Sequence, residues 1–277
     1  MFDIWRKEEK LAEEVYAKDN YLIVDNANVK STSSESQTCV IYCSSNNIWS
    51  PNEEYAFKRS FIQNDYYEWQ KLRVKGAIRE IWIRDIYKSW YVTGINSEIN
   101  SVDKLIEFLK DATKGYSVEI VGSSAGGYIA ALLSKALNAE KTIVFSAQFD
   151  LNHRGALDAN PFLQRYKGTE RERYYNLCDY LADTKSELFY IYPMKNEQDA
   201  YHFRKIQSIK SKYIHCLGLK SKRHGVVVYK CCIEPLINME AVKMRELFKK
   251  ENRSSPLFMS LRLVGGGQNI AQYFDRN

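Results

Sequence analysis

Short apolar runs alternate with amphipathic segments along most of the chain, and this alternation predicts a sheet built from strand–helix–strand units. Seven runs have the length and the content of branched and aromatic residues that strands favour. The predicted strands span residues 21–25, 39–43, 80–84, 117–122, 141–147, 187–192 and 212–219. Several are nearly continuous apolar runs, as parallel strands covered on both faces should be. The pattern therefore predicts an α/β fold with a mostly parallel central sheet flanked by helices on both faces.

Helical patterns are clearest in the segments that follow the middle strands. After Ser101, a candidate N-cap, apolar residues recur with helical spacing through Leu109. A second helix is expected up to Leu137, and further helical patterns lie at about 199–211 and 235–251. Such one-sided stripes predict helices that pack one face on the sheet.

One connection is long enough to have its own structure. About forty residues, rich in Tyr, Arg and Asn, join the strands predicted at 141–147 and 187–192. Connections of this length tend to be functional or to carry helices. We interpret residues 150–186 as a helical cap inserted into a single α/β domain that spans residues 1–277, a length that such domains often reach.

The total charge gives no support for a nucleic-acid partner, but its distribution singles out one region. The chain has 40 Lys and Arg against 34 Asp and Glu, and a net charge of +6 is small for 277 residues. The excess is local, because no carboxylate occurs between Arg204 and Ile233. This segment is either an ordinary solvated surface or a region that attracts an anionic substrate.

The sequence gives little support for a membrane-spanning, a disulfide-stabilised or a metal-binding protein. No run approaches the ~20 apolar residues of a membrane span, and the charged start lacks the apolar core of a signal peptide. The six cysteines form no CxxC pair, and the four histidines form no HxxxH or HExxH pattern. We therefore expect a cytoplasmic protein with no membrane span, no metal and no bound cofactor.

The most informative motif is G-x-S-x-G, formed by Gly122, Ser124 and Gly126. It lies between the strand predicted at 117–122 and an amphipathic helix, where a nucleophile elbow requires it. Small neighbours let the backbone turn sharply, and the Ala125 amide at the helix start is placed to donate to an oxyanion. The alternative is a glycine-rich turn that packs tightly or binds a phosphate.

A nucleophilic serine needs a histidine base, and four histidines compete for this role. His224 is favoured because it lies in the polar loop after the last predicted strand. His202 lies within a helical pattern and is the alternative base. His215 falls inside a predicted strand, and His153 comes too early in the Ser–acid–His order typical of this motif.

The acid should follow the strand predicted at 187–192. Asp199 is favoured there and Glu197 competes with it, whereas Asp150 is a candidate one strand earlier. Asp199 also suits the N-cap of the following helix, which is its structural alternative.

Further site residues are expected on loops at the same edge of the sheet. The second oxyanion donor should be the backbone amide of Ser44 or Ser45, after the strand predicted at 39–43. Trp90 and Tyr91 can stack on a sugar ring or pack beneath the cap.

Three segments carry a resemblance to a known superfamily. GSSAGG at 122–127, DAYH at 199–202 and RHG at 223–225 resemble the α/β-hydrolase superfamily over about residues 20–250. The short oxyanion loop, GSSAGGYIAALL and DAYH are similar, more narrowly, to bacterial capsular-polysaccharide O-acetyltransferases of the meningococcal capsule type.

This resemblance implies an α/β-hydrolase fold and a triad of Ser124, Asp199 and His224. It implies a small-molecule acyl donor, with acetyl-CoA as the candidate co-substrate, and a glycan as acceptor. Lys222 and Arg223, next to His224, are placed to attract an anionic donor or glycan. The sequence leaves open an O-acetyltransferase, a carboxylesterase or thioesterase, and a non-catalytic binding scaffold of this fold.

Overall fold

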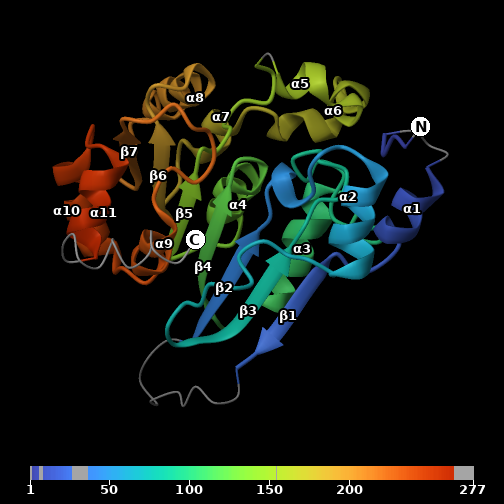
Figure 1. Ribbon diagram of the computed structural model, residues 1–277, viewed down its shortest axis with the longest axis horizontal. Coiled ribbons are helices and arrows are strands. Elements are labelled where there is room, and N and C mark those ends of the chain that lie inside the picture. The colour runs from blue at the N-terminus through green and yellow to red at the C-terminus, as the bar shows by residue number, and fades with distance from the viewer. Residues whose placement is uncertain (1, 6–8, 27–36, 154, 265–277) are drawn as a thin grey trace.

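The sheet has seven strands in the order β1-β3-β2-β4-β5-β6-β7 in the computed structural model, which describes residues 2–5, 9–26, 37–153 and 155–264 (Figure 1). The strands are β1 (Tyr21–Asp25), β2 (Thr38–Cys43), β3 (Ala77–Ile83), β4 (Ser117–Ser123), β5 (Lys141–Phe145), β6 (Glu187–Pro193) and β7 (Ile214–Leu219). All seven predicted strands are present, with ends shifted by at most three residues.

The sheet is parallel except at one edge. β1 pairs antiparallel with β3, and every other neighbouring pair is parallel. The carboxyl ends of the six parallel strands therefore meet at one edge of the sheet, where ligands of open α/β sheets bind.

Side chains of β2 show how the sheet forms two cores. Ile41 and Cys43 point to one face, whereas Val40 and Tyr42 point to the other, and all four are buried. A strand buried on both faces has no polar positions to alternate with, which explains its continuous apolar run.

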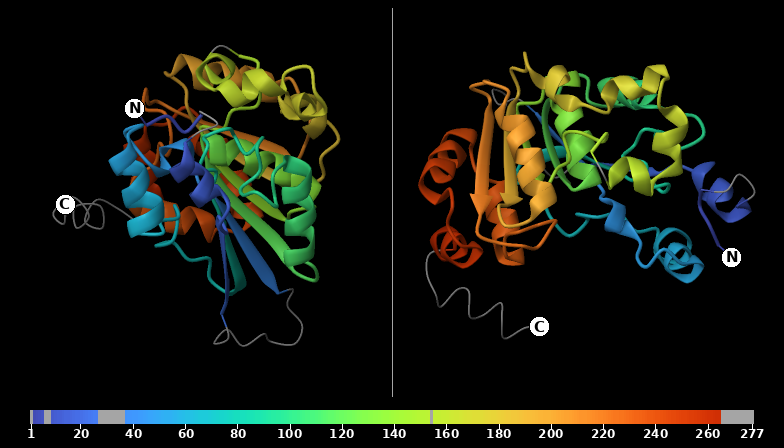
Figure 2. Two further views of the ribbon diagram at one scale, coloured as in Figure 1. Left: turned by 90° about the vertical axis from the view of Figure 1, so that its right-hand side faces the viewer. Right: turned by 90° about the horizontal axis from the view of Figure 1, so that it is seen from above.

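Each face of the sheet is covered by its own helices (Figures 1 and 2). The first face packs against α3 (Val102–Ala112), α4 (Ala125–Ala136), α7 (Leu177–Leu181) and α8 (Glu197–Gln207). The second packs against α9 (Lys230–Ile237), α10 (Ala241–Glu251) and α11 (Pro256–Leu263). The predicted fold class is confirmed.

One helix prediction needs correction, and one predicted N-cap is confirmed. The helix expected at 235–251 is two helices, α9 and α10, because Asn238 leaves the helix and bonds to the backbone of Arg73 and Lys75. The predicted N-cap at Ser101 is confirmed, since its Oγ accepts a hydrogen bond from the amide of Lys104.

The remaining helices lie before β3 and within the long connection. Those before β3 are α1 (Lys10–Tyr16), the 3-10 helix η1 (Asn46–Ile48), α2 (Glu54–Lys58) and the π-helix η2 (Arg59–Gln63). They share a small core with Ile4 and Tyr87.

Residues 150–186 contain α5 (Ala156–Ala159), α6 (Pro161–Tyr166), the 3-10 helix η3 (Glu170–Tyr174) and α7. In Figure 1 and in the left view of Figure 2, α5 and α6 lie above the carboxyl ends of the parallel strands. That this segment acts as a cap stays a prediction. None of the helices in the described ranges combines the length and the apolar run needed to cross a membrane.

Candidate active site

Ser124 occupies a strained turn between β4 and α4. Its φ of 53° and ψ of −120° lie outside the regions that a non-glycine residue prefers, and its amide is held by the Phe145 carbonyl at 2.8 Å. Strain of this kind persists where the surroundings over-determine it, which is common at functional sites. The motif therefore forms the sharp strand-to-helix elbow that its spacing predicted.

Two glycines let the backbone close around this turn. A Cβ on Gly122 would lie 2.2 Å from the Gly126 carbonyl oxygen, and a Cβ on Gly126 would lie 2.2 Å from the Cys43 carbonyl oxygen. Both contacts are with backbone, so a side chain at either position would force the elbow apart.

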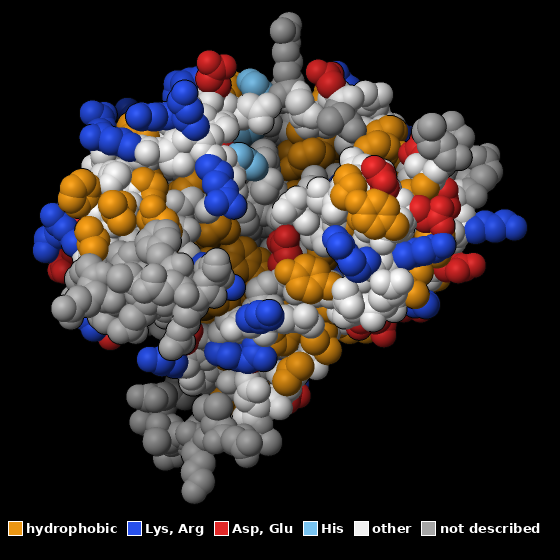
Figure 3. Space-filling view, in the orientation of Figure 1, with side chains coloured by type: hydrophobic (Ala, Val, Ile, Leu, Met, Phe, Trp, Pro, Cys, Tyr) orange, Lys and Arg blue, Asp and Glu red, His pale blue; other side chains and the backbone are white. Residues whose placement is uncertain are grey.

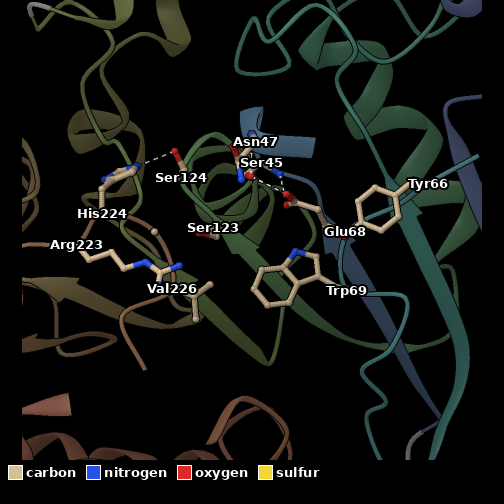
Figure 4. A pocket seen from close by; sticks show the side chains of 11 residues that line it. Ser45, Asn47, Tyr66, Glu68, Trp69, Ser123, Ser124, Arg223, His224 and Val226 are labelled. Atoms are coloured by element: carbon tan, nitrogen blue, oxygen red, sulfur yellow. Dashed lines mark hydrogen bonds between the residues drawn. The ribbon is translucent and has the colours of Figure 1, made fainter. Parts of the chain in front are cut away.

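The structure brings Ser124, His224 and Asp199 into one hydrogen-bonded chain (Figure 4 shows the first link). His224 Nε2 lies 3.0 Å from Ser124 Oγ, and His224 Nδ1 lies 2.8 Å from Asp199 Oδ2. A carboxylate only accepts, so Nδ1 carries the proton and Nε2 is free to accept the serine hydrogen. This arrangement can remove a proton from Ser124.

Asp199 is fully enclosed, with 1% of its side chain exposed. It lies in the first turn of α8, whose N-cap is Asn196 and not Asp199, so the capping alternative is wrong. Its second oxygen, Oδ1, is buried and has no hydrogen-bond partner among the described residues. The side chain therefore directs its hydrogen bonding at His224.

The competing acids have other contacts. Glu197 is exposed. Asp150 accepts hydrogen bonds from Tyr201 at 2.7 Å and pairs with Lys205 at 3.1 Å. Burial by itself would raise the pKa of Asp150. The hydrogen bonds from Tyr201 and Lys205 outweigh burial and hold this pKa below its ordinary value.

The competing histidines also lie elsewhere. His202 is buried and accepts the Phe149 amide at 3.2 Å, and burial lowers the pKa of His202 to about 3. His215 pairs with Glu187 at 2.7 Å on the sheet, as its position within a predicted strand indicated. Of the four histidines, all within the described residues, only His224 contacts Ser124.

The predicted oxyanion donors differ in availability. The Ala125 amide, at the start of α4, has no acceptor within the described part of the chain. Ser44 is a wrong prediction, because its amide donates to the Ile83 carbonyl at 3.0 Å as part of the sheet edge. The Ser45 amide already donates a hydrogen bond to the carboxylate of Glu68, a residue that the sequence did not single out.

Glu68 binds Ser45 through both carboxylate oxygens. Oε2 accepts the Ser45 amide at 2.6 Å, and Oε1 accepts the Ser45 hydroxyl at 2.8 Å. Burial raises the pKa of Glu68, although the hydrogen bonds from Ser45 oppose the rise. In this conformation the Ser45 amide can meet an oxyanion only after Glu68 releases it.

A cavity of about 530 Å³ opens beside Ser124 (Figures 3 and 4). Most of its lining is polar or aromatic, and Gly225 and Val226 complete it: Ser45, Asn47, Tyr66, Glu68, Trp69, Ser123, Ser124, Arg223, His224, Gly225 and Val226. Of the two basic residues predicted to attract a substrate, Arg223 lies in this lining, whereas Lys222 is exposed and outside it. In Figure 3 a hollow with histidine and basic side chains at its rim marks this face of the molecule.

The two predicted aromatic residues have separate roles. Tyr91 is a wrong prediction as a sugar-stacking residue, because it is fully buried and its hydroxyl donates to the Ser44 carbonyl at 2.8 Å. Trp90 is half-buried, and its indole N–H donates to Gln148 at 3.1 Å. Gln148 in turn lies 3.4 Å from Ser124 Oγ.

The missed residues share one property. Glu68, Trp69 and Gln148 lie on loops, outside any motif, and reach the site through tertiary contacts. A residue that follows directly after a parallel strand, as Gln148 nearly does after β5, was the one available signal.

Comparison with known proteins adds fold-level similarities. No protein-family model and no curated protein matches the chain. MPT51 of Mycobacterium tuberculosis shares 11% identity over 82% of this chain and 92% of its own, with a TM-score of 0.49. The capsule O-acetyltransferase of Neisseria meningitidis serogroup A shares 13% over 84% and 91%, with a TM-score of 0.45.

An α/β-hydrolase enzyme, MGS-MChE2, from the sediment metagenome of the Mar Chica lagoon in Morocco shares 13% identity over 72% of this chain and 83% of its own, with a TM-score of 0.41. Identities this low say nothing about substrates. The mostly parallel sheet, the elbow at Ser124 and the chain order of Ser, Asp and His define an α/β-hydrolase fold.

Proposed function

We propose that this protein is a serine-dependent acyl-transfer enzyme that works through an acyl ester on Ser124. The observation that carries the proposal is the continuous chain of hydrogen bonds from Ser124 through His224 to Asp199, with distances of 3.0 and 2.8 Å. A strained serine, an oriented base and a buried acid are the parts that nucleophilic catalysis by serine requires.

The reaction divides into two half-reactions. Ser124 Oγ attacks the carbonyl carbon of the donor while His224 takes the serine proton. The leaving group departs with that proton, and the acyl ester remains. The acceptor then gives its proton to His224 and attacks the ester carbonyl, and the departing Ser124 Oγ takes that proton back from His224 as the acylated acceptor leaves. Asp199 holds the imidazole tautomer and stabilises the imidazolium in both halves.

The Ala125 amide supplies the oxyanion donor that is available in this conformation. The Ser45 amide joins it only when Glu68 moves, so we assign Ser45 a part in the transition state and none in the resting site. Donors at this position stabilise charge that develops during the reaction, which raises kcat.

The lining of the cavity suits an anionic donor and a polyhydroxylated acceptor. Arg223 offers a charge for the phosphates of a donor such as acetyl-CoA. Asn47 and Glu68 offer hydrogen-bond partners for sugar hydroxyls, and Trp69 offers an aromatic surface. We therefore favour O-acetyl transfer from acetyl-CoA to a glycan, in the cytoplasm where this donor is made, over a carboxylesterase or thioesterase.

Labelling with a fluorophosphonate tests the nucleophile. We expect the full chain to be labelled at Ser124 and the Ser124→Ala and His224→Ala variants to lose turnover while they stay folded. An unlabelled Ser124 in the folded wild-type protein would instead identify a non-catalytic binding scaffold.

Release of CoA from acetyl-CoA, with and without a capsule-type polysaccharide, tests the acceptor. The proposal predicts that the polysaccharide accelerates release and becomes acetylated. Equal release without the polysaccharide would favour hydrolysis, and a thioesterase or esterase would then be the correct function.

A further inference from the structure

A side-chain amide from the end of β5 reaches the proposed nucleophile. Gln148 is half-buried, and its Nε2 donates a hydrogen bond to Ser124 Oγ at 3.4 Å. Its Oε1 accepts a hydrogen bond from Trp90 Nε1 at 3.1 Å. Within the described residues these are the two partners of the amide, so one N–H of Nε2 remains free.

Trp90 decides which end of the amide faces Ser124. An indole N–H can only donate, so it must meet the amide oxygen. The amide nitrogen then faces Ser124, whose own hydrogen is directed at His224 Nε2. A reversed amide would set two donors against each other at Trp90, which excludes that orientation.

The loop that carries Trp90 is held in an unusual conformation. Trp90 and Tyr91 have φ values of 53° and 62°. The buried Asp85 accepts the backbone amides of Tyr91 at 2.8 Å and Ser89 at 2.6 Å, which ties the loop together. Two successive non-glycine residues in this region are strained, and such strain is retained where the conformation serves a site.

We propose that Gln148 is a further catalytic residue, which donates a hydrogen bond to the reacting Ser124 oxygen, and that Trp90 is its positioning residue. This rests on the proposed function. Negative charge grows on Ser124 Oγ as its proton moves to His224, and the Gln148 N–H points at that atom. Such a donor is worth most where charge develops in a partly enclosed site.

The same N–H acts in both half-reactions. Ser124 Oγ is the nucleophile when the acyl ester forms, and it is the leaving group when that bond breaks. Negative charge therefore grows on one atom twice. The distance of 3.4 Å is long, but catalytic hydrogen bonds are often long in the free enzyme and tighten in the complex.

Steady-state kinetics with p-nitrophenyl acetate on the full chain test the proposal. We expect Gln148→Leu, which keeps the bulk but removes the donor, to lower kcat by about 10- to 100-fold, as loss of a transition-state donor does. KM should change by less than about threefold, because the contact strengthens only in the transition state.

Trp90→Phe tests the positioning role, because phenylalanine keeps a ring and lacks the N–H. We expect a smaller loss of kcat, about 3- to 10-fold, and no further loss when Trp90→Phe is added to Gln148→Leu. A purely structural contribution of Trp90 would instead lower kcat in both backgrounds, and that result would overturn its assignment.

Two outcomes separate this proposal from the proposed function. Wild-type kcat in folded Gln148→Leu, with Ser124→Ala inactive, would overturn the role of Gln148 and leave the proposed function standing. Activity that survives in Ser124→Ala would overturn both. If the leucine variant fails to fold, Gln148→Met, which keeps an unbranched side chain without a donor, gives the same comparison.

Discussion

Histidine has two different roles in this molecule, and burial separates them. His224 exposes 37% of its side chain and links Asp199 to Ser124. His202 is buried, and its Nδ1 accepts the amide of Phe149, so it must be neutral there. Desolvation penalises the charged imidazole, which lowers the pKa of His202 to about 3.

Neutral His202 should make the protein sensitive to acid. The unfolded chain binds a proton at this histidine near pH 6.5, whereas the folded chain does not until about pH 3. Above about pH 6.5 His202 is neutral in both states and does not destabilise the fold. As the pH falls from 6.5 towards the folded-state pKa of about 3, protonation of the unfolded chain lowers the free energy of unfolding. We expect the free energy of unfolding to fall by about 2 kcal/mol between about pH 7 and pH 5 through this residue.

The His202→Asn variant isolates this contribution. Asparagine Oδ1 can replace Nδ1 as the acceptor for Phe149, but it does not titrate. Urea unfolding of both proteins at several pH values should show a shallower acid dependence in the variant. Parallel curves would contradict the prediction. Activity at neutral pH should be unchanged, because His202 does not contact Ser124.

At the scale of elements, the site depends on how closely α4 approaches β2. The first turn of α4 lies against the end of β2, where a Cβ on Gly126 would be 2.2 Å from the Cys43 carbonyl oxygen. The approach fixes the Ala125 amide relative to the Ser44–Ser45 loop. A rigid turn of this kind is needed because oxyanion donors act only when they are held in place.

Gly126→Ala should push α4 away from β2. We expect the free energy of unfolding to fall by about 2–4 kcal/mol, because backbone cannot yield as a flexible side chain does, and we expect most activity to be lost. Chemical denaturation and ester hydrolysis measure the two effects.

Gly115→Ala is the matched control. Gly115 has a φ of 86° and nothing within 4 Å of its missing Cβ, so alanine there meets backbone strain alone. It should cost about 1 kcal/mol and leave activity intact. Equal losses of unfolding free energy and of activity in the two variants would show that the close approach of α4 to β2 is not what the site depends on.

Strands were predictable from the sequence more completely than helices. All seven strands follow from their apolar runs. The central strands are buried on both faces, and the edge strands β1 and β7, which are less buried, are still rich in branched and aromatic residues. The break between α9 and α10 was not predictable, since Asn238 leaves the helix to bond to Arg73 and Lys75, far away in the sequence. The N-cap of α8 at Asn196 was missed because Asp199 is an equally suitable residue type.

At the scale of the whole molecule, the excess positive charge is distributed unevenly, because no carboxylate occurs between Arg204 and Ile233. Basic side chains gather on the side of the molecule that carries α8, β7 and α10 (Figure 3). Arg223 lines the cavity and has no ion pair within the described residues, so its charge is available to a ligand.

Arg223→Ala should raise the KM for acetyl-CoA by about 3- to 10-fold at low ionic strength, and the difference should shrink with added salt because an exposed charge is screened. Lys222→Ala is the control, since Lys222 is the neighbouring exposed charge outside the cavity lining. An equal effect of the two variants would assign the attraction to the general charge of the loop.

By itself, the sequence determined the fold class, the elbow with Ser124 at its tip, and the two loops that carry the candidate acids and the favoured base His224. Each of these depends on local information: apolar periodicity, a fixed spacing of small residues, or position directly after a strand. The same information favoured Asp199 but could not exclude Glu197, because residues two positions apart share most local signals.

Only the tertiary structure decided which neighbouring groups are free to act. In the folded chain the Ser45 amide is hydrogen-bonded to Glu68, and Tyr91 is buried. Trp90 and Gln148 meet beside Ser124. These contacts join loops that are distant in the chain, and no periodicity or spacing records them. Hydrogen-bonding capacity belongs to each residue, but its use depends on what the fold places within reach.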